Sequence, residues 1–155
     1  MTQGQVISIY IAHNRGEQTI SVDQVHAIPG MGIEGDRYFN KHDAHDTNSK
    51  PGREITLIEI EAIVSMQNED RIQISPDQTR RNIVTRGITL NNLVGRIFFI
   101  GNIQLRGIRL CEPCQSLANR TDPHLLSSMV HRGGLRAEIL TEGIIHINDS
   151  IETTN

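Results

Sequence analysis

The chain of 155 residues has no tryptophan, two cysteines and few aromatic residues, which make up 3% of it. No stretch of about 18 apolar residues occurs, so we expect no membrane-spanning segment. Two cysteines make a poor disulfide framework, and the first residues lack the features of a secretory signal, so we expect a cytoplasmic protein. A formal net charge of −3 argues against non-specific binding to nucleic acid, which needs a net basic face.

Most segments either alternate apolar and polar residues or are short apolar runs between glycine, proline and asparagine, which is typical of strands. A chain of this length predicts one domain over residues 1–155. Many short strands with few helices favour a mostly β fold closed into a barrel, because closure hides the sheet edges. The predicted strands are residues 6–13, 21–28, 54–58, 81–85, 96–101, 103–110, 135–143 and 143–151.

Helix is sparse. Apolar residues at helical spacing predict a helix over residues 59–70. A second helix is predicted over residues 123–132, with Asp122 as its N-cap, and a third short helix is expected to begin after Pro113.

Residues 29–53 and 111–134 are the longest irregular segments, and long loops in compact domains are usually functional. The first contains GMGIEGDRYFN, where glycines around Asp36 and Arg37 would let a ligand approach the backbone. A turn with a solvated ion pair is the simpler interpretation. It also contains HDAHD, which could bind a metal ion or a proton, or form a solvated polar loop.

Both cysteines lie in RLCEPCQSL, and several interpretations remain open. A redox pair would need a βαβ setting, which the surrounding segments do not predict. A zinc site needs four ligands, and the nearby His124 and His131 are separated by more than the usual gap. A helix beginning after the motif would stabilise a reactive thiolate at Cys114 through its free amides. A buried, inert cysteine is an equally good interpretation.

Positive charge is carried mainly by arginine, which occurs thirteen times against two lysines. The segment TRRNIVTRG places Arg80 and Asn82 on one face of a predicted strand and Arg81 on the other. A buried arginine needs an anion beside it. That anion would be a protein carboxylate or the phosphate of a ligand.

The ordered motifs of the chain resemble those of the MOSC family, the domain related to the C-terminal part of molybdenum cofactor sulfurases. The segments that carry the resemblance are GIEGDRY, EITLIEIEAI, RRNIVTRGITLNNLVGRIFFIGNIQLRG, CEPCQSL and GGLRAEILTEGIIHINDSI. Together they span most of the chain, from about Gly30 to Ile151. They look like the compact, stand-alone bacterial members of the family.

The resemblance implies a β-rich barrel with a pocket that holds one working cysteine, which by position is Cys114. This residue would ligate molybdenum in the pyranopterin cofactor, and the protein would reduce N-hydroxylated compounds with electrons from a partner protein. Alternatively, Cys114 would carry a persulfide received from a cysteine desulfurase, with Cys111 able to resolve it as a disulfide. A third option is a binding module without chemistry. His42 or His45 could donate a proton.

The resemblance also implies which residues hold the cofactor. Arg37 in the glycine-rich loop, and Arg81 with Asn82 on the strand, match family positions that would bind the cofactor phosphate. Thr85 and Gly87 would line the same cleft.

Overall fold

The computed structural model describes residues 3–39, 53–112 and 115–154. Within these ranges the strands are β1 (Gln3–Ile11), β2 (Ile20–Val22), β3 (Gln24–Ile28), β4 (Gly32–Ile33), β5 (Ile55–Glu59), β6 (Ile83–Arg86), β7 (Ile97–Ile100), β8 (Ile103–Leu110), β9 (Leu135–Ile139), β10 (Gly143–His146) and β11 (Ser150–Thr153). The helices are α1 (Ile60–Asn68), α2 (Gln115–Arg120) and α3 (Leu125–Ser128), with 3₁₀ turns η1 (Pro76–Thr79) and η2 (Leu90–Leu93).

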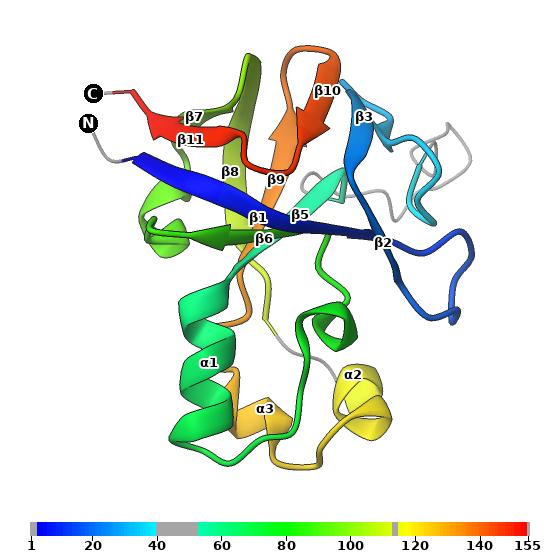
Figure 1. Cartoon of the computed structure of the whole chain (residues 1–155), viewed down its shortest axis with the longest axis vertical. Coiled ribbons are helices and arrows are strands. Elements are labelled where there is room, and N and C mark those ends of the chain that lie inside the picture. Colours follow the sequence, from blue (N-terminus) through cyan, green and yellow to red (C-terminus); the bar gives the residue numbers. More distant parts are fainter. Residues whose placement is uncertain (1–2, 40–52, 113–114, 155) are drawn as a thin grey trace.

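The strands form a closed barrel, which confirms the predicted mostly β fold. Seven of the described strands follow one another in the order β11-β7-β8-β9-β5-β6-β1, and β1 pairs back with β11. The β5–β6 pair is parallel and the other pairs of the ring are antiparallel. The small sheet β10-β3-β4 lies beside the barrel, and the helices gather at its other end (Figure 1). None of the described helices combines the length and the apolar character needed to cross a membrane.

Strands β5 and β6 are buried on both faces, which explains why their sequences are continuous apolar runs rather than alternating ones. Leu57 and Ile83 lie side by side in the barrel interior, and they are fully buried. Ile58 and Val84, the next pair in the register, face outward and pack in a second cluster with residues of the three helices. The barrel and its helical layer therefore share these two strands.

The predicted helices are present, although two of them are shorter than predicted. The helix expected over residues 59–70 is α1, and the one expected after Pro113 is α2. The helix predicted over residues 123–132 is only the single turn α3, and its N-cap is His124. Asp122, the predicted N-cap, lies two residues before the observed cap, and its carboxylate accepts the backbone N–H of His124 at 2.8 Å.

Two segments predicted as single strands are each divided between the two sheets. Residues 21–28 are β2, which extends the barrel sheet from β1, and β3, which belongs to the small sheet. Residues 143–151 are β10 in the small sheet and β11 in the barrel. Asn148, with φ of 77°, provides the turn between β10 and β11. An alternating pattern cannot show which sheet a strand joins, because both sheets present the same period of two.

Two glycines before β9 bring the first cysteine against the barrel. The N–H of Cys111 donates to the carbonyl of Gly134 at 2.7 Å. A Cβ at Gly133 would overlap the Cys111 carbonyl, and a Cβ at Gly134 would overlap the carbonyl of Leu57. The close approach of these backbones therefore requires glycine at both positions.

Replacing Gly134 by alanine should lower the free energy of unfolding by about 3 kcal/mol, because the new Cβ adds an overlap to the strain of φ at +99°. Gly30 is the matched control, since its φ is +75° and no atom lies near its Cβ position. Gly30→Ala should cost only about 1–2 kcal/mol, from backbone strain alone. Urea unfolding measures both values, and equal losses would contradict the role of close backbone approach.

Candidate functional site

A cavity of about 360 Å³ lies between the segment after β1, the residues before β6, strand β9 and helix α2. Its lining is dominated by guanidinium groups. One acidic residue, Glu112, is present among the described lining residues. Six of the thirteen arginines of the chain line this arginine pocket: Arg15, Arg37, Arg80, Arg81, Arg120 and Arg136.

The arginines of this pocket are close enough to repel one another. Burial lowers the pKa of Arg80, and the positive charges of Arg37 and Arg120 lower it further. Arginine nevertheless stays protonated in proteins, so the pocket is strongly positive at neutral pH. Such a cavity is suited to an anion, because a bound negative charge relieves the repulsion between guanidinium groups.

The positive charge continues beyond the pocket along strands β8 and β9. Arg109 on β8 lies directly opposite Arg136 on β9. Burial, together with the charges of Arg136 and Arg53, lowers the pKa of Arg109. Like charges placed directly opposite each other on paired strands are destabilising. The pair of Arg109 and Arg136 therefore does not serve to stabilise the sheet.

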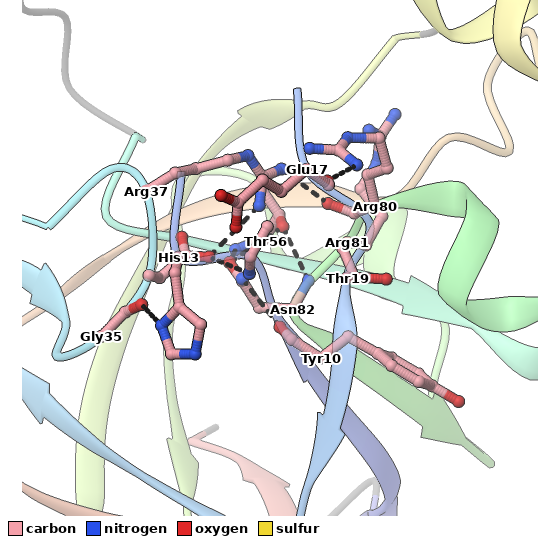
Figure 2. A network of polar contacts seen from close by, with 12 residues as sticks. Tyr10, His13, Glu17, Thr19, Gly35, Arg37, Thr56, Arg80, Arg81 and Asn82 are labelled. Carbon is pink, nitrogen blue, oxygen red and sulfur yellow. Dashed lines mark hydrogen bonds and ion pairs between the residues drawn. The ribbon is translucent and has the colours of Figure 1, made fainter. Parts of the chain in front are cut away.

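Arg37 is held in a buried ion pair beneath the pocket. Its side chain is 7% exposed and that of Asp36 is 1% exposed, so the interpretation of a solvated ion pair in a turn is wrong. Arg37 donates to Asp36 Oδ1 at 3.2 Å and to the carbonyl of Arg80 at 3.1 Å (Figure 2). Its guanidinium group also lies over the ring of Tyr38. The glycine-rich loop is thereby tied to the residues before β6.

Arg81 is buried, and backbone carbonyls surround its guanidinium group. Its Nε donates to the Gly133 carbonyl at 2.8 Å, Nη1 to the Thr79 carbonyl at 3.3 Å and Nη2 to the Cys111 carbonyl at 3.4 Å. Arg81 therefore joins three separate segments of the chain, one of which leads into the cysteine motif. Carbonyl dipoles provide part of the negative potential that a buried guanidinium requires.

Asn82 joins three strands of the barrel through its side-chain amide. The Oδ1 atom accepts the backbone N–H and the hydroxyl of Thr56 on β5, both at 3.1 Å. The Nδ2 atom donates to the carbonyl of Tyr10 on β1 at 3.1 Å (Figure 2). Asn82 is 3% exposed and does not line the arginine pocket. Its observed contacts hold β1 and β5 against the residue that precedes β6.

Thr85 and Gly87 lie away from the arginine pocket. Thr85 is fully buried in β6, with Oγ1 3.4 Å from the Ile58 carbonyl. Gly87 follows the other end of β6, where its N–H donates to Glu61 and where it lines a separate hollow with Arg86. Of the five residues expected to hold the cofactor, the structure brings Arg37 and Arg81 together at one cavity.

Three arginines of the pocket were not expected from the sequence: Arg15, Arg120 and Arg136. They come from the loop after β1, from α2 and from β9, and no local motif connects them. The signal that could have found them is the general preference for arginine over lysine in this chain. The sequence predicts Arg80 on one face of the strand, but β6 begins at Ile83, and the left-handed backbone of Arg80, with φ of +62°, lies before it.

Of the four residues CEPC, the structure describes Cys111 and Glu112. Cys111 is 1% exposed. Glu112 lines the arginine pocket, as does Leu117 in α2. Cys114, the predicted working cysteine, lies outside the described residues, as do His42 and His45.

The two histidines considered as zinc ligands lie apart. Nδ1 of His131 is 3.4 Å from Oε1 of Glu112, at the edge of the arginine pocket. His124 lines another hollow with Asp70 and Arg132. No group of three or more histidine, cysteine or acidic side chains in the described part of the chain is arranged to hold a metal ion.

The sequence matches the MOSC domain family over residues 43–152, which is well over half of the chain. The protein therefore belongs to this family. No curated protein matches the sequence.

Several solved structures share the fold. YuaD from Bacillus subtilis superposes with a TM-score of 0.79 at 19% identity, over 99% of this chain and 97% of that chain. YiiM from Geobacillus stearothermophilus gives a TM-score of 0.73 at 16% identity, over 98% and 75% of the two chains. YiiM from Escherichia coli gives 0.66 at 18% identity, over 100% and 70%. The barrel with its appended helices is thus the architecture of small bacterial proteins.

Replacing Asn82 by alanine should lower the free energy of unfolding by about 3 kcal/mol, because it leaves the buried N–H and hydroxyl of Thr56 without their acceptor. Asn92→Ala is the control, since Asn92 is exposed and should change stability by less than about 0.5 kcal/mol. Urea unfolding measures both. An unchanged stability of the Asn82 variant would contradict its role in joining the strands.

Replacing Arg136 by glutamine should weaken the binding of inorganic phosphate about tenfold, because one charged hydrogen-bond donor of the pocket is lost. Arg96→Gln removes the same charge from an exposed position outside the pocket and should leave phosphate binding unchanged. Isothermal titration calorimetry at low salt measures both affinities. Equal effects of the two substitutions would show that only the overall charge matters.

Proposed function

We propose that this MOSC protein binds the molybdenum cofactor and reduces N-hydroxylated compounds in the cytoplasm, using electrons from a partner protein. The observation that supports the proposal is the convergence of six arginines on one cavity beside the cysteine motif. The cofactor carries a phosphate, and bidentate guanidinium groups are the side chains best suited to bind one. The residues present therefore fit the anionic end of this cofactor.

The pocket arginines fall into two groups, those bonded to the protein and those with donors available to a phosphate. Arg37 and Arg81 are engaged with the protein itself and fix the walls of the cavity. Arg15 and Arg136 make no side-chain hydrogen bond or ion pair with any residue that the structure describes, so their donors can turn to a ligand. The anchored guanidinium groups lose little side-chain entropy when an anion binds, whereas Arg15 and Arg136 become ordered on it.

Cys114 is the proposed molybdenum ligand. Support comes from its neighbours along the chain, because Glu112, two residues before it, and Leu117, three residues after it, both line the arginine pocket. A thiolate is a soft ligand of the kind that such a centre needs. When bound, the molybdenum centre would supply the two-electron chemistry for cleavage of the N–O bond.

Reduction of a hydroxylamine to an amine and water consumes two electrons and two protons. Among the described lining residues, Glu112 has the only carboxyl group, and its Oε1 lies 3.4 Å from Nδ1 of His131. We therefore assign this pair the delivery of protons to the leaving oxygen. His42 and His45 are further proposed donors, and they lie outside the described residues.

The alternative function, a persulfide carrier that receives sulfur from a cysteine desulfurase, requires a thiol that two proteins can reach in turn. It does not require a cavity lined by six arginines. The pocket therefore favours a retained anionic ligand over transient sulfur on Cys114.

Protein purified from a host that makes the pterin cofactor should contain close to one molybdenum atom per chain, as measured by elemental analysis. Cys114→Ser should lose this molybdenum, because the hydroxyl is a harder and weaker ligand than the thiolate. Cys111→Ser should retain most of it. Equal molybdenum in the two variants would refute the assignment of Cys114 as ligand.

The persulfide alternative predicts a different result in the same preparations. Wild-type protein would lack molybdenum, and incubation with a cysteine desulfurase would add the mass of one sulfur atom to the peptide containing Cys114. Reduction would remove that mass.

A further inference from the structure

A second hollow, of about 310 Å³, shares Arg80 and Arg120 with the arginine pocket. We call it the polar groove. Its remaining lining residues come from the loop after β1, from η1 and from the end of α2: Gln18, Thr19, Asp77, Gln78 and Thr121. The two cavities therefore meet at a boundary formed by two guanidinium groups. Positive charge lies on one side, and on the other lie four neutral polar side chains and the carboxylate of Asp77.

The polar groove offers hydrogen-bonding groups that the protein leaves available. Gln78 accepts the backbone N–H of Ser75 through its carbonyl oxygen at 3.0 Å. No described residue accepts its two amide N–H groups, so these can bind a ligand. Gln18 is exposed and has no hydrogen bond to a described residue, so both ends of its amide are available.

The two hydroxyl groups of the polar groove are available as acceptors. Thr19 donates to the carbonyl of Asp77 at 2.8 Å, and Thr121 donates to the carbonyl of Leu117 at 2.9 Å. Each oxygen keeps lone pairs for a ligand donor. Together the four side chains can bind hydroxyl groups and the mixed donor and acceptor edge of a planar amide-bearing ring. They are poorly suited to an apolar group or to a second phosphate.

The boundary arginines keep most of their donors. Nη1 of Arg80 donates to the Glu17 carbonyl at 2.6 Å, and Nη1 of Arg120 donates to the Gly16 carbonyl at 3.3 Å. Each guanidinium carries five N–H groups, so each retains several beyond these bonds. Both arginines are anchored to the same loop, and their mutual repulsion makes the space between them favourable for an anion.

We propose that the arginine pocket and the polar groove together bind a nucleotide, with its phosphate at Arg80 and Arg120 and its ribose and base in the polar groove. Side-chain amides such as Gln18 and Gln78 pair with the donor and acceptor edge of a base. A volume of about 310 Å³ is in the range of small-ligand sites. The nucleotide is either free or joined through its phosphate to the pterin cofactor, and its recognition is the same in both cases.

The proposal shares its phosphate-binding arginines with the proposed function, but it does not depend on molybdenum. Full-length protein from a host that lacks the pterin cofactor should be titrated calorimetrically with AMP, ribose 5-phosphate and inorganic phosphate. AMP should bind at least about tenfold more tightly than inorganic phosphate, with ribose 5-phosphate between them. Equal affinities of AMP and phosphate would overturn the proposal, as would equal affinities of AMP and ribose 5-phosphate.

Gln18→Ala tests the groove directly. It should weaken AMP binding about fivefold and leave phosphate binding unchanged, because Gln18 lines the polar groove and does not line the arginine pocket. Gln73→Ala is the matched control, since Gln73 is also exposed but lines neither cavity. Thr121→Val is a second test that keeps the side-chain shape. AMP affinity that is unchanged in both groove variants would overturn the proposal.

The outcomes separate this proposal from the function proposed above. Protein that contains molybdenum but binds AMP no better than phosphate would overturn only the nucleotide assignment. Protein that lacks molybdenum but prefers AMP would overturn the cofactor assignment and support the groove. Mass spectrometry of ligands released on denaturation distinguishes the sources, because a nucleotide released together with molybdenum indicates the pterin-linked form.

Discussion

The guanidinium groups of the arginine pocket repel one another, and the structure at this end of the barrel has to offset that repulsion. A positive charge placed near another positive charge raises the free energy of the folded state unless dipoles or anions offset it. Arg37 is offset by the carboxylate of Asp36, Arg81 by three backbone carbonyls, and Arg80 and Arg120 by carbonyls of the loop after β1. The loops around the pocket are therefore held in place by the same arginines that make it positive.

The barrel supplies the rigid frame that these contacts need. Asn82 joins β1 and β5 immediately beside Arg81, so the two residues just before β6 provide both the structural amide and the buried charge. Gly134 allows the segment before β9 to approach β5, and its carbonyl accepts the N–H of Cys111, which fixes the beginning of the cysteine motif at the same end. Sites placed on such elements keep their geometry better than sites placed on free loops.

The mostly β fold, the helix α1 and the family could be predicted from the sequence. Periodicity can be read within a short segment, and the family motifs can be read from their order along the chain. It did not show that residues 21–28 divide between two sheets, since one alternating pattern serves either sheet. The motif around Arg81 and Asn82 was recognised, but their contacts were not. Both residues bind protein groups from segments distant in sequence, and such pairings have no local signature.

The sequence by itself determined the large number of arginines, the two cysteines, the apolar runs of β5 and β6 and the membership in the MOSC family. Only the tertiary structure decided that Arg15, Arg120 and Arg136 share one cavity with Arg37 and Arg81. It also decided that Thr85 and Gly87 lie elsewhere. The physical reason is that closing the barrel brings together strand ends and loops from the whole chain, whereas residues along one strand are carried to opposite faces and opposite ends.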